Sequence, residues 1–237
     1  MDESLFEEAR RVFDIERRWL DRTLELAEES FDDAVRLLAG CSGKVVVCGM
    51  GKSGHVGRKI AATMVSTGTL AHFLHPAEGV HGDVGMLQRG DVALVLSKSG
   101  ETPEVAALIP SFRRLDIPVV AMVADTGSLL ARSASVVLAL PDDVEACPYD
   151  LAPTASSTAM MALGDALAMA MLRMRDFSPE DFAEVHPAGM LGRKLLTRVC
   201  DLMTGPPLPV VPEQSPLSEA IAMLTRHRGI CITTDDS

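Results

Sequence analysis

Basic residues, aromatic rings, paired cysteines and long apolar runs are all scarce in this sequence of 237 residues, and each scarcity excludes a class of protein. The formal net charge is −11, which argues against a general nucleic-acid binder, because such proteins present a basic face to phosphates. Aromatic residues make up only 4% of the chain, so Ala, Val, Leu and Met must fill the interior of a protein that is 47% apolar.

Cysteine usage and the apolar runs point to the reducing cytoplasm. The five cysteines are odd in number and form no C-x-x-C pair, a pattern typical of free thiols. The longest apolar stretch, Ala159–Leu172, is too short to span a bilayer and contains Asp165, so we expect a buried core helix and no membrane partner. The first ten residues are acidic, so no signal peptide is expected.

The middle of the chain alternates between short apolar runs and helical patterns. This rhythm predicts an α/β protein in which a doubly wound, five-stranded parallel sheet carries helices on both faces. One long N-terminal helix is expected before the sheet, over residues 3–38, and its apolar stripe suits packing on its own domain or, second, on a partner helix. The expected strands are Val45–Cys48, Leu70–Leu74, Val92–Leu96, Pro118–Val123 and Ser135–Leu140.

A glycine-rich stretch follows the first expected strand and opens a helix. Gly51, Lys52 and Ser53 lie in this turn, where backbone N–H groups and a helix N-terminus favour an anion. A dinucleotide site is not favoured, because the second strand closes on His75 and not on an acid. A triphosphate P-loop is not favoured either, because Val46 stands where its first glycine belongs. A turn without a ligand would leave Lys52 and Ser53 unexplained, so we expect a phosphate site.

A second loop of the same character follows the third strand. Ser97, Ser99 and Thr102 could each donate to a phosphate oxygen, although helix capping alone would explain Thr102. Loops at the carboxyl ends of parallel strands share one edge of the sheet, so the two loops predict a single phosphate-binding site.

Histidine and glutamate residues near this edge are further candidates. His75, Glu78 and His81 would share a face, as a metal site requires, only if their loop were helical, so the metal alternative stays weak. Glu145 lies just past the fifth strand, and glycines fix the backbone after His186.

Towards the C-terminus the composition of the sequence changes. We expect one domain over residues 1–203, whose first 40 residues form the N-terminal helix, then a linker over 204–209 rich in Gly and Pro. Residues 210–237 predict a strand, a helix and a strand, which are too little to bury a core alone.

Several separated stretches together resemble a known family, the bacterial D-arabinose 5-phosphate isomerases, which carry a sugar isomerase (SIS) domain. The resemblance covers roughly residues 1–205, and the tail resembles the first part of a CBS module, here incomplete. The matching stretches are GMGKSGHVGRKIA, HPAEGVHGDVGM, SKSGETPEV, EACPYDLAPTASSTA, LGDALA and HPAGMLGRKLL.

The resemblance implies interconversion of D-ribulose 5-phosphate and D-arabinose 5-phosphate through a cis-enediol, feeding Kdo biosynthesis for lipopolysaccharide or capsule. It implies a cytoplasmic homotetramer with sites shared between subunits, and neither a cofactor nor a metal. The catalytic residues it implies are Lys52, His81, Glu104, Glu145 and His186, and the phosphate is expected at Gly51, Ser53, Ser97, Ser99 and Thr102.

Within this set we expect Glu145 to act as the carbon base and His186, from a neighbouring subunit, to move oxygen-bound protons. Glu104 and His186 are the alternatives for the base, and a structural ion pair is the alternative role for Glu145. Two other functions are open: another SIS sugar-phosphate isomerase, for example of a hexulose 6-phosphate, or a non-catalytic sugar-phosphate sensor.

Overall fold

The chain forms two compact units, residues 1–187 and 188–237, and each is described by itself. The computed structural model describes residues 5–187, 189–202, 209–226 and 232–234. The expected linker at 204–209 lies outside the described residues except for its last position.

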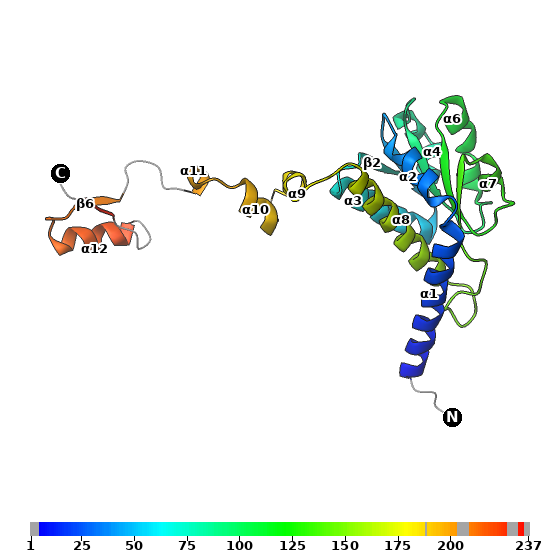
Figure 1. Cartoon of the computed structure of the whole chain (residues 1–237), viewed down its shortest axis with the longest axis horizontal. Coiled ribbons are helices and arrows are strands. Elements are labelled where there is room, and N and C mark those ends of the chain that lie inside the picture. The colour runs from blue at the N-terminus through cyan, green and yellow to red at the C-terminus, as the bar shows by residue number, and fades with distance from the viewer. Residues whose placement is uncertain (1–4, 188, 203–208, 227–231, 235–237) are drawn as a thin grey trace. The chain divides into compact units, whose positions relative to one another are not determined.

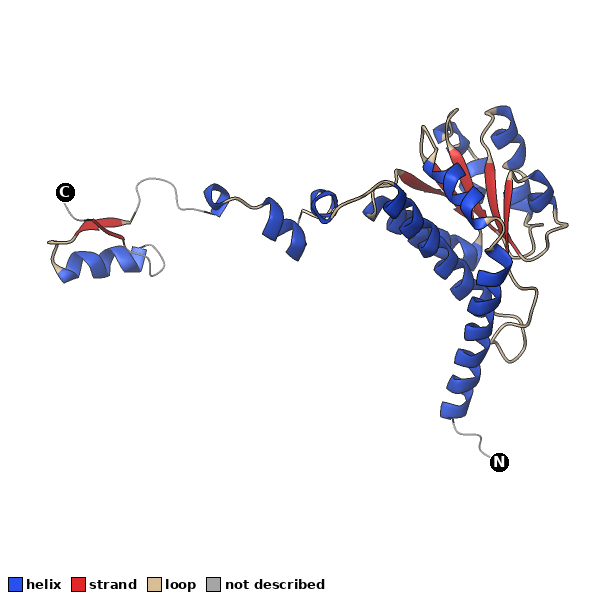
Figure 2. Ribbon diagram, viewed as in Figure 1, coloured by secondary structure: helices blue, strands red, loops and turns tan. Residues whose placement is uncertain are grey.

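The core of the first unit is a five-stranded sheet in which every pair of neighbours is parallel (Figure 2). The prediction of a parallel five-stranded α/β sheet is confirmed, and each strand begins or ends within one residue of the expected bounds. Three of the strands are buried along their whole length, as their unbroken apolar sequences require. The strands are β1 (Val45–Gly49), β2 (Ala71–Leu74), β3 (Val92–Leu96), β4 (Val119–Val123) and β5 (Val136–Ala139).

The spatial order of the strands is β2-β1-β3-β4-β5. The chain therefore runs outwards from β1 to β2 and then crosses back to β3. In open parallel sheets a crevice forms where the order reverses, outside the carboxyl ends of the strands. Here that switch point separates the loops that follow β1 and β3.

Helices cover both faces of the sheet (Figure 1). Alternate residues of each strand point to opposite faces. Val45 and Val47 of β1 face one apolar cluster, and Val46 and Cys48 face the other. The first cluster is covered by α1 (Leu5–Ala27), α2 (Phe31–Ala39), α3 (Gly51–Ser66) and α8 (Ala155–Met174). The second is covered by the 3-10 turn η1 (Asp83–Met86), α5 (Pro103–Ala106), α6 (Ile109–Arg114) and α7 (Leu129–Ser133). Helix α4 (Pro76–Val80) packs next to η1 and α5.

The prediction of one uninterrupted helix over residues 3–38 is wrong, because a turn at residues 28–30 separates α1 from α2. Ser30 takes the N-cap position of α2, and two aspartates in its first turn suit the positive end of that helix. The break lets α2 bury Ala34, Val35 and Leu38 against the sheet.

The expected apolar stripe of α1 faces the chain's own core only at its C-terminal end, at Ala27. The other buried side chains of α1 are Ile15, Trp19 and Thr23, whereas Phe13 is 69% exposed. The first half of α1 extends beyond the sheet (Figure 1). The helix thus has two apolar stripes, one packed on the sheet and one open.

The core-helix prediction is confirmed for α8, although the helix is longer than the apolar stretch. With 20 residues it is long and apolar enough to cross a membrane by length and composition, and half of it is buried in this structure. Leu167 and Met171 are fully buried, and Asp165 forms an ion pair with Lys59 of α3. These contacts are those of a helix in the core of the first unit.

The remaining elements are short. Residues 103–114 form two short helices, α5 and α6, because Pro110 near the start of α6 lacks an N–H for a continuous hydrogen-bond ladder. Helix α9 (Pro179–Val185) ends the first unit. The second unit contains α10 (Met190–Leu196), α11 (Val199–Leu202), α12 (Leu217–Arg226) and a parallel pair of strands, β6 (Val210–Pro212) and β7 (Ile232–Thr234).

Candidate active site

The glycine-rich turn after β1 is a tight backbone path into α3. Gly51 has φ +53°, a conformation that side-chain-bearing residues seldom adopt. A Cβ at Gly54 would lie 2.6 Å from the carbonyl oxygen of Gly49, so strand and helix approach each other too closely for any side chain there. The first backbone N–H groups of α3 have no partner within the helix, and Ser53 lies in the same turn.

The loop after β3 brings hydroxyl groups to the same edge of the sheet. Ser97 is buried, and its hydroxyl lies 2.9 Å from that of Thr102 and accepts a hydrogen bond from Gly100 N. Thr102 occupies the N-cap position of α5, but its side chain contacts Ser97 and does not cap the helix. Ser99 accepts a hydrogen bond from Glu101 N. These contacts fix the loop and leave its hydroxyls at the switch point.

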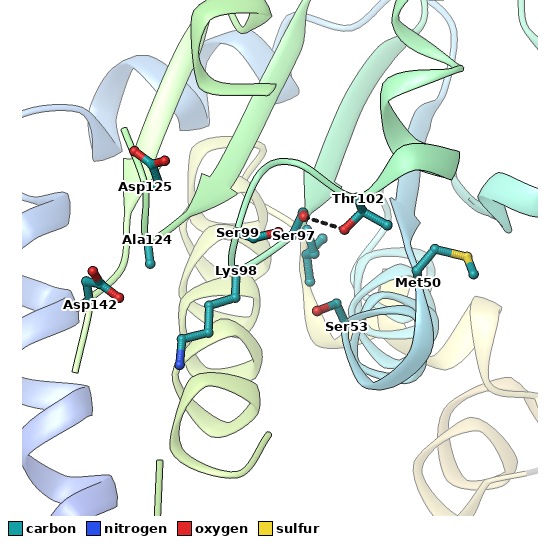
Figure 3. A pocket seen from close by; sticks show the side chains of 10 residues that line it. Met50, Ser53, Ser97, Lys98, Ser99, Thr102, Ala124, Asp125 and Asp142 are labelled. Atoms are coloured by element: carbon teal, nitrogen blue, oxygen red, sulfur yellow. Dashed lines mark hydrogen bonds between the residues drawn. The ribbon is translucent and has the colours of Figure 1, made fainter. Parts of the chain in front are cut away.

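A cavity of about 380 Å³ lies between the two loops (Figure 3). Of the residues expected to bind phosphate, Ser53, Ser97, Ser99 and Thr102 line it, and Gly51 belongs to the adjoining turn. Residues not expected from the sequence also line it: Lys98 from the same loop, Asp125 after β4, Asp142 after β5, and Met50. The cavity thus joins a group of hydroxyls to one ammonium and two carboxylates.

Glu145 is buried behind this cavity, and both of its carboxylate oxygens are occupied. Its Oε1 lies 3.0 Å from Lys98 Nζ. Its Oε2 accepts hydrogen bonds from the backbone N–H groups of Thr154 (2.9 Å) and Ser156 (3.1 Å) and from the Thr154 hydroxyl. The carboxylate therefore satisfies the first turn of α8, where the N-cap residue Thr154 forms no side-chain cap of its own.

These contacts determine the charge on Glu145. Burial raises its pKa, but the hydrogen bonds from Ser156, Thr154 and Lys98 outweigh burial and lower the pKa to about 2. The carboxylate is consequently ionised at neutral pH, as a base must be. A carboxylate with so low a pKa holds an abstracted proton weakly, however, so its contacts favour a positioning role.

Helix α1 holds the segment that carries Glu145. Trp19 Nε1 donates to Val144 O (3.0 Å), and the guanidinium of Arg11 donates to Ala146 O. Glu145 N itself donates to the side chain of Asp150. The residues on both sides of Glu145 are thus fixed by the N-terminal helix.

Three other expected catalytic residues do not line the cavity. Lys52 lies exposed in the first turn of α3, and Glu104 lies half-buried in the first turn of α5. His81 is exposed at the end of α4. The segment between His75 and His81 is helical, the condition for the metal alternative, but the described residues contain no group of three His, Cys, Asp or Glu able to hold a metal ion.

His186 follows α9, and its ring is held in a defined orientation. It stacks on Phe182 at 4.0 Å between ring centroids, and its Nδ1 lies 3.0 Å from Phe182 O. Because a carbonyl only accepts, Nδ1 carries the proton in this contact and Nε2 is left as the acceptor nitrogen in the neutral ring.

His186 follows the end of α8 that lies near the amino ends of the strands, whereas the cavity lies at their carboxyl ends. The first turn of α8 contacts Glu145. At the other end of the helix, Arg175 donates to Gly68 O and Ala39 O, which precede β2 and β1. A helix of 20 residues is about 30 Å long, and the short α9 spans only about 10 Å. The structure of one chain therefore keeps His186 away from the residues that line the cavity.

The chain is similar to known proteins over most of its length. The family model of the SIS domain matches residues 38–170. Arabinose 5-phosphate isomerase of Salmonella typhi is 47% identical over 96% of this chain and 70% of its own length. The enzyme of that name from Pseudomonas aeruginosa is 48% identical over 96% of this chain and 71% of its own. A protein of E. coli CFT073, solved in complex with arabinose 5-phosphate, is 36% identical and superimposes with a TM-score of 0.75 over 77% of this chain and 97% of its own.

Proposed function

The chain belongs to the arabinose 5-phosphate isomerase family of SIS-domain proteins, and from that premise we propose that it interconverts D-ribulose 5-phosphate and D-arabinose 5-phosphate. The observation that carries the proposal is the cavity at the switch point. Its hydroxyls from Ser53, Ser97, Ser99 and Thr102 suit a phosphate, and Lys98, Asp125 and Asp142 continue it with groups that suit a polyhydroxyl chain.

The reaction needs few groups. A base removes a proton from the carbon next to the carbonyl, the electron pair moves to the carbonyl oxygen to give a cis-enediolate, and the proton returns at the neighbouring carbon. A second group moves a proton between the two oxygens. Arabinose 5-phosphate closes a furanose ring through its 4-hydroxyl, so ring opening is needed in that direction only.

The residues expected from the sequence divide these roles. His186, with Nε2 free to accept, suits the oxygen-bound protons and ring opening. Lys52 and His81 orient the sugar. For the carbon base, the occupied oxygens and low pKa of Glu145 favour Glu104 or His186 over the expected Glu145.

Solvent exchange separates these candidates. The C1 proton of ribulose 5-phosphate and the C2 proton of arabinose 5-phosphate should exchange with deuterium, as followed by NMR. A Glu145→Gln variant that is folded and still exchanges at the wild-type rate excludes Glu145 as the base, whereas loss of exchange with intact stability would make it the base again.

The complete site is proposed to form between copies of the chain in a homotetramer. His186 lies far from its own cavity, and the exposed stripe of α1 offers Phe13 to a second copy. Mixing unfolded Lys52→Ala and His186→Ala chains and refolding them together should restore activity that neither variant has alone, because some sites then receive both intact residues. No restoration in assembled mixtures would place both residues in one chain's site.

We also propose a cytoplasmic enzyme without a metal, a cofactor or a nucleic-acid partner, which supplies arabinose 5-phosphate to Kdo biosynthesis. Dialysis against EDTA should leave its activity unchanged, and a loss that added metal reverses would contradict this.

Two alternatives remain to be tested against this function: an SIS isomerase of another sugar phosphate, and a sugar-phosphate sensor. The similarity to isomerases over 96% of the chain favours an enzyme of pentose phosphates. Incubation with ribulose 5-phosphate, followed by identification of the product, distinguishes these functions. Arabinose 5-phosphate is the expected product, whereas ribulose 5-phosphate recovered unchanged from a folded sample would favour the sensor.

A further inference from the structure

Lys98 carries an ammonium group into the cavity next to the hydroxyl loop. Its side chain is one-third exposed, and Nζ lies 3.0 Å from Glu145 Oε1 and 5.1 Å from the centre of the Trp19 ring. An ammonium has three N–H donors, and within the described residues Glu145 is the one hydrogen-bond acceptor found for it. The remaining donors are available to a molecule in the cavity.

The place of this ammonium suits the reacting end of the substrate. Figure 3 shows the hydroxyls of Ser97 and Thr102 turned towards each other, while the side chain of Lys98, which also lines the cavity, runs away from them. A sugar phosphate held by its phosphate at the hydroxyls would extend its carbon chain in that direction. The four-carbon stem of Lys98 therefore carries the charge towards the carbonyl end.

The surroundings of Lys98 hold the charge in one position. Glu145 is itself fixed, because the backbone N–H groups of Thr154 and Ser156 donate to its carboxylate. Side chains of α1 also donate to the backbone carbonyls of the residues on both sides of it. The face of Trp19, which is 1% exposed, attracts the cation and shields one side of it from water. A donor fixed before the reaction stabilises developing charge without reorganising during it.

We propose that Lys98 is a further catalytic residue, whose ammonium donates hydrogen bonds to the sugar oxygens on which negative charge develops in the enediolate. Lys98 transfers no proton in this role: the base takes the carbon proton, the electron pair moves to the carbonyl oxygen, and Lys98 stabilises that oxygen. Glu145 and Trp19 are positioning residues that act through Lys98. The proposal rests on the function proposed above, in which Lys52 orients the sugar.

Two ligands that differ only at the reacting end test this role. 5-Phospho-D-arabinonate carries a carboxylate at C1, where the enediolate is charged, and D-arabinitol 5-phosphate carries a neutral hydroxyl there. Calorimetric titration should show that Lys98→Met weakens arabinonate binding by about 100-fold, the usual effect of removing one oxyanion donor. Binding of the neutral alcohol should change by less than about threefold, and Lys98→Arg should recover most of the arabinonate affinity, because it keeps the charge.

The control is Lys59→Met, which removes another lysine–carboxylate contact, that of Lys59 with Asp165, outside the cavity. It should bind both ligands as the wild type does. Because the two ligands are compared within each variant, a general loss of folding would weaken both and cannot imitate a selective effect. In steady-state kinetics Lys98→Met should lower kcat far more than it changes KM.

The outcomes separate this inference from the proposed function. Equal weakening of both ligands, or no weakening of either, overturns the role of Lys98 while leaving the isomerase proposal to its own assay. A wild type that binds both ligands but converts no ribulose 5-phosphate overturns the isomerase proposal, and the selectivity of binding still decides the contact made by Lys98. A wild type that binds neither ligand overturns both.

Discussion

Replacing Glu145 by glutamine should destabilise the protein strongly, because the carboxylate holds the start of α8 and the ammonium of Lys98. The lowering of its pKa from 4.5 to about 2 corresponds to about 3 kcal/mol of folding free energy at neutral pH. We therefore expect Glu145→Gln to lower the free energy of unfolding at pH 7 by about 3 kcal/mol, as measured by urea denaturation at one fixed protein concentration.

The effect should depend on pH in a defined direction. The folded-state pKa is depressed, so the contribution of Glu145 is complete above its unfolded pKa of 4.5 and disappears as the pH falls towards 2. Wild type and variant should therefore converge in stability over that range. Glu104→Gln is the matched control: it removes a half-buried carboxylate of the expected catalytic set, one for which the described residues show no hydrogen bond or ion pair.

A difference of less than about 0.5 kcal/mol at pH 7 would show that the Glu145 carboxylate does not hold the fold, because that is the ordinary range for a surface substitution. It would also restore Glu145 as a candidate base, since a carboxylate kept only for chemistry can be removed without loss of stability.

Three further results are expected. Iodoacetamide should alkylate Cys147 well before Cys48, as measured by peptide mass spectrometry. Backbone N–H groups of the following loop lower the pKa of Cys147, whereas burial raises the pKa of Cys48 to about 12. Equal rates of alkylation would contradict these environments. Ser97→Ala and Thr102→Ala should each raise KM for the sugar phosphate by roughly tenfold, because each variant loses a hydrogen bond to a charged group. An unchanged KM would show that the phosphate does not bind at these hydroxyls. Phe13→Asp should dissociate the assembly in analytical ultracentrifugation without lowering the stability of the isolated chain, because the ring is exposed; an unchanged assembly would remove this stripe from the interface.

Local patterns predicted the sheet and both loops of the cavity. Unbroken apolar runs such as Val45–Cys48 occur only where both faces of a strand are buried, and the alternation of strands with helices leaves few topologies for a parallel sheet. The carboxyl ends of the strands then bring Ser53 and Ser97 together without any long-range information beyond the strand order.

Contacts between distant segments were beyond the reach of the sequence. The two apolar stripes of α1 have similar spacing, and only the packing of Trp19 on the segment before Glu145 decides which one is buried. Lys98 belongs to the hydroxyl-rich loop after the third strand, but its contact with Glu145 could not be predicted, because the two residues are 47 positions apart in the sequence. Asp125 and Asp142 could have been predicted as cavity residues from the sequence, because each follows closely after a strand at the edge of the sheet where ligands bind.

The isomerase function is tested most directly by incubating the protein with D-ribulose 5-phosphate in deuterated water and following the mixture by NMR until equilibrium. D-Arabinose 5-phosphate should form, and deuterium should accumulate at its C2 and at C1 of ribulose 5-phosphate, because a base exchanges the carbon proton through an enediolate. Unchanged ribulose 5-phosphate in a folded sample, or arabinose 5-phosphate that never gains deuterium, would contradict this reaction.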